Sequence, residues 1–288
     1  MTVLPSMPAC IFWSEPVADA PQLHPDWLVP QWPAPDGVHA VCTTRAGGIS
    51  LPPYSSLNLG VHVGDTAQAV ARNRGLLAQA LGGAPVLMNQ VHGTALLQLQ
   101  GQSQVAVPTA DGAWTLARGP VCAVMVADCL PVLLCSSDGT WVAAVHAGWR
   151  GLAGAGGFGI LEATFKVFGA VAQLKLTPDA PELIAWLGPC IGPQAFEVGA
   201  DVRSAFLSNL VNASQASAAS DCFVSLGQGK YLADLPGLAR LRLAALGVSQ
   251  VYGNDGSPPW CTVGNPLRFF SYRRDGVSGR MAACIWRA

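Results

Sequence analysis

Two histidines and one cysteine stand where apolar segments of the sequence end or break. His92 follows the apolar run in VLMNQVHG, Cys129 interrupts VCAVMVADCLPVLL, and His146 follows the run in WVAAVHAG. Two neutral imidazoles and one thiolate are a natural three-ligand set for zinc, and the fourth position then stays open for water or substrate, as in catalytic zinc sites. Because a thiolate is a soft ligand, Zn²⁺ or Cu⁺ suits this set better than Mg²⁺.

A structural interpretation of the same three residues stays open on spacing alone. A single histidine at a strand end is most often a hydrogen-bonded structural residue, and a cysteine with apolar neighbours usually behaves as a small buried hydrophobe. No short-range metal motif such as HExxH or CxxC accompanies them. Two aspartates, Asp111 in TADG and Asp128 in VADC, would support the metal interpretation by orienting a ligand imidazole or by acting as a base.

Several arginines follow apolar segments at turns. Arg45 precedes a pair of glycines, Arg150 lies in HAGWRGLAGAGG, and Arg273 and Arg274 follow FFSY. A guanidinium beside exposed backbone N–H groups makes a good fork for a phosphate oxyanion, although ordinary surface ion pairs would use the same residues. The glycine-rich segment is neither a Walker loop nor a GxGxxG motif, so hydrolysis of nucleoside triphosphates has no support.

Composition excludes several classes of protein. The chain has 16 Lys and Arg against 17 Asp and Glu, so a broad basic face for nucleic acid is not expected. Its longest apolar stretch, residues 121–135, is interrupted by Asp128 and Pro131 and falls short of the roughly 20 residues that a membrane span needs. Residues 1–44 lack the positive charge of a secretory signal, and the nine cysteines form no CxxC pair. We therefore expect a cytoplasmic protein with reduced thiols.

The elements that would position the candidate residues are apolar strands and amphipathic helices. Strand composition marks residues 38–44, 86–88, 121–126, 132–135, 141–145, 184–187, 251–252 and 280–286. Helical spacing marks residues 66–81, the stretch from Leu152 to Phe168, and residues 200–211 and 234–246. The small residues of 213–221 indicate a loop, and the turn at 136–139 predicts a hairpin of two buried strands.

The organisation of the chain is that of one main domain. A Pro- and Trp-rich stretch at residues 1–36 predicts an irregular N-terminal arm, and neither a linker nor a repeat divides the rest. We expect residues 37–288 to form a single catalytic domain of the α/β or α+β class, with a mixed central β-sheet flanked by helices. The two histidines and the cysteine would each lie at a strand end of that sheet.

Six motifs carry a resemblance to a known family. They are NQVHG (89–93), TADGAWT (109–115), VADCLPVLL (126–134), VAAVHAGWRGLAGAGG (142–157), LGPCIG (187–192) and FFSYRRDG (269–276). Together they resemble the bacterial laccase-domain or polyphenol-oxidoreductase family, now regarded as purine nucleoside phosphorylases, to which the human laccase domain-containing protein belongs. The resemblance runs from about residue 38 to the C-terminus and keeps the family's order of motifs.

The resemblance implies a zinc enzyme that cleaves adenosine and inosine with phosphate, giving the free base and ribose 1-phosphate. It also implies activity on 5′-methylthioadenosine and deamination of adenosine. The family's zinc ligands carry over onto His92, Cys129 and His146, and LNLGVHVGD, which fits a family pattern, puts His62 near the site. The implied fold is a layered α/β sandwich related to the cysteine-hydrolase domain of a bacterial cytotoxic toxin. A homo-oligomer is compatible with this resemblance.

For such an enzyme the small-molecule partners are a purine nucleoside and phosphate. We expect two or more of Arg45, Arg150 and Arg273 to hold the phosphate, and we count His62 among the binding residues. The metal would act as a Lewis acid or hold an activated water near the purine. Asp128 or Asp111 would shuttle the proton. Copper could replace zinc at such a nitrogen and sulfur site.

Three other functions stay open at this point. Cys129 could be the nucleophile of a metal-free hydrolase with His146 as its base, and zinc would then inhibit the enzyme. A single copper could support oxidation of phenols, but five histidines with no HxH pair cannot build the copper cluster of a blue multicopper oxidase. A binding module for a partner protein would explain the low charge, but not histidine and cysteine at strand ends beside arginines.

Overall fold

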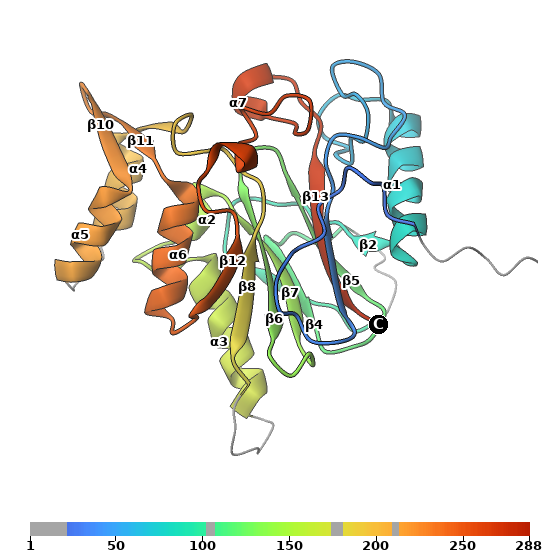
Figure 1. Ribbon diagram of the computed structural model, residues 1–288, viewed down its shortest axis with the longest axis horizontal. Coiled ribbons are helices and arrows are strands. Elements are labelled where there is room, and N and C mark those ends of the chain that lie inside the picture. The colour runs from blue at the N-terminus through green and yellow to red at the C-terminus, as the bar shows by residue number, and fades with distance from the viewer. Residues whose placement is uncertain (1–21, 102–106, 174–180, 209–212) are drawn as a thin grey trace, which may run out of the picture.

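The computed structural model describes residues 22–101, 107–173, 181–208 and 213–288, and its strands form two main sheets that stack face to face (Figure 1). The six-stranded sheet has the order β12 (Gln250–Gly253), β8 (Leu183–Leu187), β6 (Leu130–Ser136), β7 (Val142–Ala147), β4 (Gly112–Thr115) and β3 (Leu96–Gln98). The four-stranded sheet has the order β1 (Val38–Cys42), β13 (Met281–Arg287), β5 (Val121–Val126) and β2 (Pro85–Val86). Both sheets combine parallel and antiparallel pairs.

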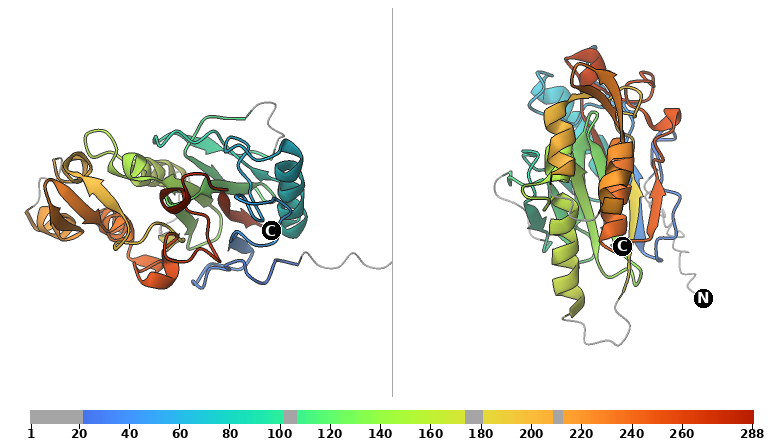
Figure 2. Two further views of the ribbon diagram at one scale, coloured as in Figure 1. Left: turned by 90° about the horizontal axis from the view of Figure 1, so that it is seen from above. Right: turned by 90° about the vertical axis from the view of Figure 1, so that its left-hand side faces the viewer.

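Helices cover both outer faces of this pair of sheets. Helix α1 (Ala67–Leu81) packs on the four-stranded sheet, whereas α3 (Ile160–Gln173) and α6 (Leu235–Ala245) pack on the six-stranded sheet. In the right-hand view of Figure 2 the latter two helices stand in front of the strands. The expected layered, mixed α/β sandwich is therefore confirmed, but its strands divide between two stacked sheets rather than forming one.

The remaining elements lie at the margins of the sandwich. A small sheet of β10 (Phe223–Gly227), β11 (Lys230–Ala233) and β9 (Glu197–Gly199) stands beside α4 (Ala200–Leu207) and α5 (Ala213–Asp221). Three short helices complete the fold: α2 (Trp149–Ala153), the 3₁₀ helix η1 (Pro258–Trp260) and α7 (Tyr272–Asp275). Among the residues that the structure describes, no helix combines the length and the apolar character that crossing a bilayer would require.

The alternation of side chains along β6 shows why its sequence is apolar throughout. Val132 and Leu134 face the helices of the six-stranded sheet, whereas Leu133 and Cys135 face the other sheet. Because successive residues of a strand point to opposite faces, a strand that is covered on both sides must be apolar at every position. The same arrangement confirms the predicted hairpin, since β6 and β7 pair antiparallel across the turn at 136–139.

The predicted helices at 66–81 and 234–246 are confirmed together with their ends. Thr66 caps α1 by accepting a hydrogen bond from the backbone N–H of Ala69, and Gly82 ends the helix in the left-handed conformation at φ 70°. Asp234 caps α6 in the same way by accepting from the N–H of Gly237. These local signals lie in the sequence itself, which is why the boundaries could be predicted to within a residue or two.

Two sequence-based expectations about helices were wrong. Residues 213–221 form helix α5 instead of a loop, because their alanines are strong helix formers and Ala219 finds a buried place in the core. The helix expected after Gly151 is divided into α2 and α3 by the glycine-rich segment 154–159. Gly154 has φ +67°, and a β-carbon there would lie 2.1 Å from the carbonyl oxygen of Phe158, so the chain must turn at that point.

The predicted N-terminal arm is described only in part, because residues 1–21 lie outside the described ranges. Residues 22–36 contain no helix or extended strand and join the sandwich through an isolated bridge between Leu28 and Cys42. Trp27 is buried in the core beside α1, and its indole N–H donates to the carbonyl of Ala46 at 3.1 Å. The division into an arm and one domain from residue 37 stays a prediction.

Candidate metal centre and its cavity

Three candidate residues that lie far apart in the sequence meet at one edge of the two sheets. The side chains of His92, Cys129 and His146 bring a ring nitrogen or sulfur of each to within 4.8 Å of one another. The sulfur of Cys129 lies 3.6 Å from Nε2 of His92, and the two imidazole centroids are 4.8 Å apart. Such a group could hold a metal ion through two nitrogens and one sulfur.

The topology explains why these three side chains converge. His92 follows β2 in the four-stranded sheet, and His146 belongs to β7 in the six-stranded sheet. Cys129 occupies the connection from β5 to β6, where the chain passes from one sheet to the other. Gly148 leaves room for the group, since a β-carbon there would lie 2.6 Å from the His92 ring and 3.1 Å from the Cys129 sulfur.

Asp111 holds the backbone of the His92 turn and the imidazole of His146 in place. Its carboxylate, which is fully buried, accepts hydrogen bonds from the backbone N–H groups of His92 at 2.8 Å and Gly93 at 2.7 Å, and from that of Val91 at 3.2 Å. The same carboxylate lies 2.9 Å from Nδ1 of His146. Since a carboxylate can only accept, Nδ1 carries the proton and Nε2 is the nitrogen that points to the centre.

Asp111 also makes the turn at His92 tenable. His92 has a positive φ of 61°, a conformation that costs energy for a residue with a side chain. Three consecutive N–H groups of this turn point at one carboxylate. Burial alone would raise the pKa of Asp111, but the hydrogen bonds from His146 and the turn outweigh burial and lower it. Asp111 therefore stays ionised as an acceptor for both histidine segments.

The charges of the centre favour a thiolate at Cys129. Burial would raise the pKa of the Cys129 thiol, but the adjacent His146 and His92 more than offset this and lower it below the ordinary value. Burial would likewise lower the pKa of His146, but the sulfur of Cys129 and the carboxylate of Asp111 raise it overall. Because the thiolate is the form that binds metal and attacks electrophiles, the site is prepared for either chemistry.

This electrostatic arrangement predicts selective labelling of one cysteine. In protein stripped of metal, we expect iodoacetamide at neutral pH to modify Cys129 first, because its lowered pKa maintains the thiolate there. Burial raises the pKa of Cys42, Cys122 and Cys284, which should stay unlabelled. A lowered pKa means that the thiolate persists as the pH falls, so labelling should weaken only below neutrality. Peptide mass spectrometry over a pH series, with and without added zinc, measures this; equal labelling of Cys129 and Cys261 would contradict it.

A cavity of about 400 Å³ opens in front of the three residues, a size typical of small-molecule sites. Its wall includes six residues that the sequence marks as candidates: His62, His92, Asp128, Cys129, His146 and Arg273. The apolar part of the wall is contributed by Met88, Met125, Val126, Ala127, Ile191 and Phe196. The structure thus brings the candidate metal ligands, an acidic residue and a cation to one hollow.

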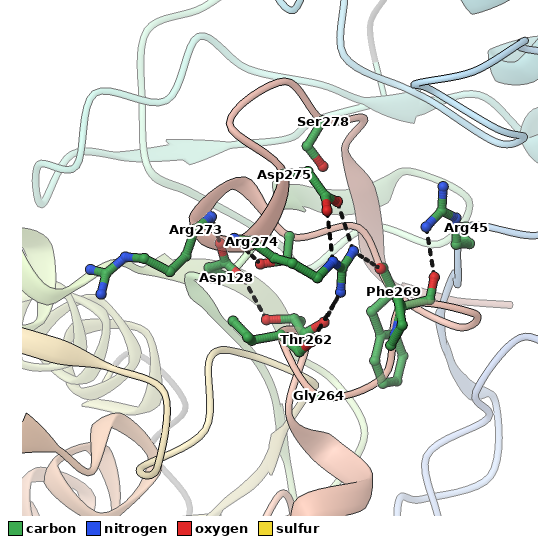
Figure 3. Close-up of polar contacts among 12 residues, drawn as sticks. Arg45, Asp128, Thr262, Gly264, Phe269, Arg273, Arg274, Asp275 and Ser278 are labelled. Atoms are coloured by element: carbon green, nitrogen blue, oxygen red, sulfur yellow. Dashed lines mark hydrogen bonds and ion pairs between the residues drawn. The ribbon is translucent and has the colours of Figure 1, made fainter.

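Asp128 links three segments of the site. One oxygen of its carboxylate accepts from Oγ1 of Thr262 at 2.5 Å, and the other accepts from the backbone N–H of Arg273 at 2.7 Å (Figure 3). Its backbone carbonyl accepts from the N–H of Ile191 at 2.9 Å, and its own φ is 90°. Both carboxylate oxygens therefore serve to fix the segments around the cavity.

Two predicted phosphate ligands do not line this cavity. Arg45 donates from Nε to the carbonyl of Ser55 at 2.7 Å and from Nη1 to that of Pro266 at 2.6 Å, so its guanidinium fastens loops together. Arg150 is exposed, and its guanidinium carbon lies 4.4 Å from the ring centroid of Trp149. Arg274 is likewise occupied, by three backbone carbonyls and Asp275 (Figure 3).

The cavity also contains residues that sequence reasoning missed, chiefly Arg280 and Tyr272. Arg280 follows Gly279 and directly precedes β13, so a cation beside glycine at the start of a strand was the signal available. The arginines singled out from the sequence instead follow strands, and Arg280 falls within the predicted strand 280–286. Gln90 was missed as well; its side-chain amide exchanges hydrogen bonds with the backbone of Met125, at 2.8 and 2.7 Å. This pair joins the His92 loop to the end of β5.

Comparisons of sequence agree with the motifs. The family described as multi-copper polyphenol oxidoreductase laccase matches residues 39–288. A Shigella flexneri protein named purine nucleoside phosphorylase YfiH is 52% identical over 262 residues, which is 90% of this chain and 98% of that protein. The protein of the same name from Escherichia coli K12 is 51% identical over the same shares of the two chains.

Comparisons of structure give the same grouping. Protein NMB0706 from Neisseria meningitidis has a TM-score of 0.77 and 45% sequence identity, over 91% of this chain and 99% of that one. YlmD from Geobacillus stearothermophilus has a TM-score of 0.75 and 32% sequence identity, over 88% of this chain and 92% of that one. Fold, motifs and sequence identity agree over most of the chain, and the protein therefore belongs to the multi-copper polyphenol oxidoreductase laccase family.

Proposed function

We propose that this protein is a zinc-dependent purine nucleoside phosphorylase. It cleaves adenosine or inosine with phosphate to give the free base and ribose 1-phosphate, and 5′-methylthioadenosine to give adenine and 5-methylthioribose 1-phosphate. It also deaminates adenosine as a side activity. The observation that carries the proposal is one cavity in which His92, Cys129 and His146 face the same space as the cation of Arg273. The names of relatives that are 52% and 51% identical support this assignment.

The residues present fit a zinc ion. Two imidazole nitrogens and one thiolate sulfur are an established ligand set for catalytic zinc, and Asp111 fixes the tautomer of His146 as a carboxylate beside a ligand histidine does. His92, Cys129 and His146 would hold the ion. When bound, zinc supplies Lewis-acid assistance and lowers the pKa of a bound water to about 7, which suits both phosphorolysis and deamination.

The chain's own residues divide the remaining tasks. The apolar wall formed by Met88, Met125 and Ile191 suits the flat face of a purine. We assign Arg273, a cation on the wall of the cavity, to holding the phosphate. Since both carboxylate oxygens of Asp128 accept hydrogen bonds from Thr262 and Arg273, we assign Asp128 to positioning the cavity wall rather than to proton transfer.

A metal-free cysteine hydrolase is the second candidate, and one observation favours it. Cys129 lies against two imidazoles and its thiolate is stabilised, which is the arrangement of an activated nucleophile. A chelator separates the two candidates, since a hydrolase inhibited by zinc would gain activity and a zinc enzyme would lose it. The described residues supply one three-residue group for a metal, so oxidation of phenols there would require a single copper in place of zinc, and a cluster of several coppers has no ligands among them.

The decisive experiment measures base release and its dependence on phosphate. Purified protein is assayed for metal content, incubated with adenosine, inosine or 5′-methylthioadenosine, and the products are separated by chromatography. We expect adenine, hypoxanthine or methylthioadenosine-derived adenine together with a pentose 1-phosphate, only when phosphate is present. Inosine formed from adenosine without phosphate would report deamination. Absence of base release with every nucleoside, at full zinc loading, would reject the proposed function.

Two further expectations accompany the function. We propose a cytoplasmic location, because the eight cysteines within the described residues are all free. We also propose that nucleoside and phosphate are the protein's small-molecule partners, and size-exclusion chromatography with light scattering would test for a homo-oligomer.

A further inference from the structure

Arg280, Arg273 and His62 bring three basic side chains to the wall of one cavity. Arg280 is half-buried, whereas Arg273 and His62 are exposed at the rim. Within the described part of the chain, none of the three forms an ion pair with a carboxylate. Basic groups that form no direct ion pair and face one hollow attract an anion to it.

Arg280 is held with part of its guanidinium unused. Its Nη1 donates to the carbonyls of Ser278 at 2.8 Å and Gly279 at 3.1 Å, and its backbone N–H donates to Oδ1 of Asn58 at 2.9 Å. Gly60 gives its stem room, since a β-carbon there would lie 2.8 Å from Cγ of Arg280. Nε and Nη2 have no hydrogen-bond partner among the described residues, so a preorganised pair of donors remains.

Arg273 repeats this arrangement at the rim. Its Nη1 donates to the backbone carbonyl of Glu197 at 3.0 Å, while Asp128 holds its backbone N–H. Figure 3 shows the guanidinium extending away from Asp128 and from the hydrogen-bonded group around Arg274. The carboxylate of Glu197 is engaged by Lys230 at 2.7 Å. Nε and Nη2 of Arg273 therefore also remain without a partner in the described chain.

The positive charge of Arg280 affects the protonation of His62. Burial, followed by the charges of Arg280 and Arg74, lowers the pKa of His62 below its ordinary value. The charges of Cys129 and Asp128 in turn act on Arg280, although burial has the larger effect on its pKa. Arg280 lines the same cavity as His92, Cys129 and His146, so a single ligand in that cavity can face both the guanidinium and the candidate metal centre.

We propose that Arg280, assisted by Arg273 and His62, forms the subsite that binds the phosphate dianion beside the candidate metal centre. This assignment rests on the proposed function, in which phosphate is a substrate, and it replaces Arg45 and Arg150 as phosphate ligands. Nε and Nη2 of Arg280 supply the paired donors that match two phosphate oxygens. The apolar wall of Met88, Met125 and Ile191 lies in the same cavity and is left for the purine. The ring of Phe196 lies under the guanidinium of Arg273, 5.6 Å from its carbon to the ring centroid, and so borders the subsite.

The test compares Arg280→Gln, Arg280→Lys and Arg273→Gln with Arg72→Gln, which removes an exposed charge on α1 outside the cavity. At full zinc loading we expect Arg280→Gln to raise KM for phosphate roughly 10–100-fold, because a charge-assisted pair of hydrogen bonds is lost. KM for adenosine should change less than about threefold, an estimate from the separate purine wall. Arg280→Lys should recover part of the loss, Arg273→Gln should show a smaller loss, and Arg72→Gln none.

A second measurement keeps this proposal distinct from the proposed function. Binding of inorganic phosphate to zinc-loaded protein, without nucleoside, is followed by calorimetry for the wild type and each variant. If the wild type binds phosphate through Arg280 but cleaves no nucleoside, the subsite is supported and the proposed function fails. If nucleosides are cleaved while Arg280→Gln and Arg273→Gln keep KM for phosphate within twofold of wild type, the subsite is refuted.

The phosphate group could also arrive as an ester on the nucleoside. Adenosine 5′-monophosphate is therefore assayed in parallel with adenosine plus inorganic phosphate. We expect inorganic phosphate to be the group that Arg280 binds, so the monophosphate should compete with phosphate weakly. Cleavage of the monophosphate that exceeds cleavage of adenosine, and that falls in Arg280→Gln, would overturn the assignment to inorganic phosphate. Circular dichroism and thermal melting confirm that each variant is folded before its constants are compared.

Discussion

Replacing Cys129 with alanine is expected to remove both the metal and the activity. The substitution deletes the only sulfur of the three-residue group and leaves two imidazoles, which are too few to retain zinc tightly. Turnover of adenosine should fall about a thousandfold or more, since assistance by a metal is worth several kcal/mol and each 1.36 kcal/mol is a factor of ten in rate. Metal analysis and initial rates on the same samples measure both effects.

Cys222→Ala is the matched control for this experiment. Cys222 is also partly buried and unpaired, but it lies before β10 and does not line the cavity. We expect it to keep the zinc content and the rate of the wild type. If Cys129→Ala retained wild-type zinc and wild-type turnover, the metal centre would have no part in the reaction. If it lost activity but kept zinc, the cysteine hydrolase would become the better interpretation.

Asp111→Asn is expected to damage the fold and the centre together. Each carboxylate oxygen of Asp111 accepts two hydrogen bonds. Oδ1 accepts from the backbone N–H of His92 and from Nδ1 of His146, and Oδ2 accepts from the backbone N–H groups of Val91 and Gly93. An amide has one oxygen only, so its NH₂ group would face two buried donors. We expect the free energy of unfolding to fall by about 2–4 kcal/mol, since each buried group left without a partner costs about 1–3 kcal/mol. Zinc affinity should fall about 10–100-fold.

Denaturant unfolding with and without zinc, together with titration against a competing chelator, measures the two losses separately. Asp36→Asn serves as the control, because Asp36 is exposed and forms no hydrogen bond through its side chain within the described residues. A variant that is less stable but binds zinc as tightly as the wild type would show that Asp111 supports only the turn. Loss of zinc affinity without loss of stability would show that Asp111 acts only by orienting His146.

Much of the candidate site could be predicted because its residues lie at the ends of strands, and the ends of neighbouring strands lie close together in a sheet. His92, Cys129 and His146 each follow or interrupt an apolar strand, and a stack of two sheets brings such ends to one edge. The apolar runs that become β6 and β7 are equally clear in the sequence, since burial on both faces requires them to be apolar throughout. The division of the strands into two sheets was not visible, because pairing partners are chosen by tertiary contacts.

The arginines show what local sequence cannot specify. Arg45 and Arg280 both stand close to glycines near the end of a strand. The guanidinium of Arg45, however, donates hydrogen bonds to backbone carbonyls of two loops. Arg280 keeps two nitrogens free because its neighbours, Ser278 and Gly279, engage only Nη1. The direction of a long side chain depends on carbonyl groups that are remote in the sequence. Helix α5 was missed for a related reason, since the burial of Ala219 is decided by packing.

The position of Cys129 on the crossing between the sheets has a consequence for the whole molecule. His92 follows a strand of one sheet, His146 belongs to the other, and the sulfur stands between them. Sliding of either sheet over its neighbour would pull the three donors apart. An ion bound there is consequently a cross-link of the sandwich, and each tenfold rise in free ion above its dissociation constant would add about 1.4 kcal/mol to global stability.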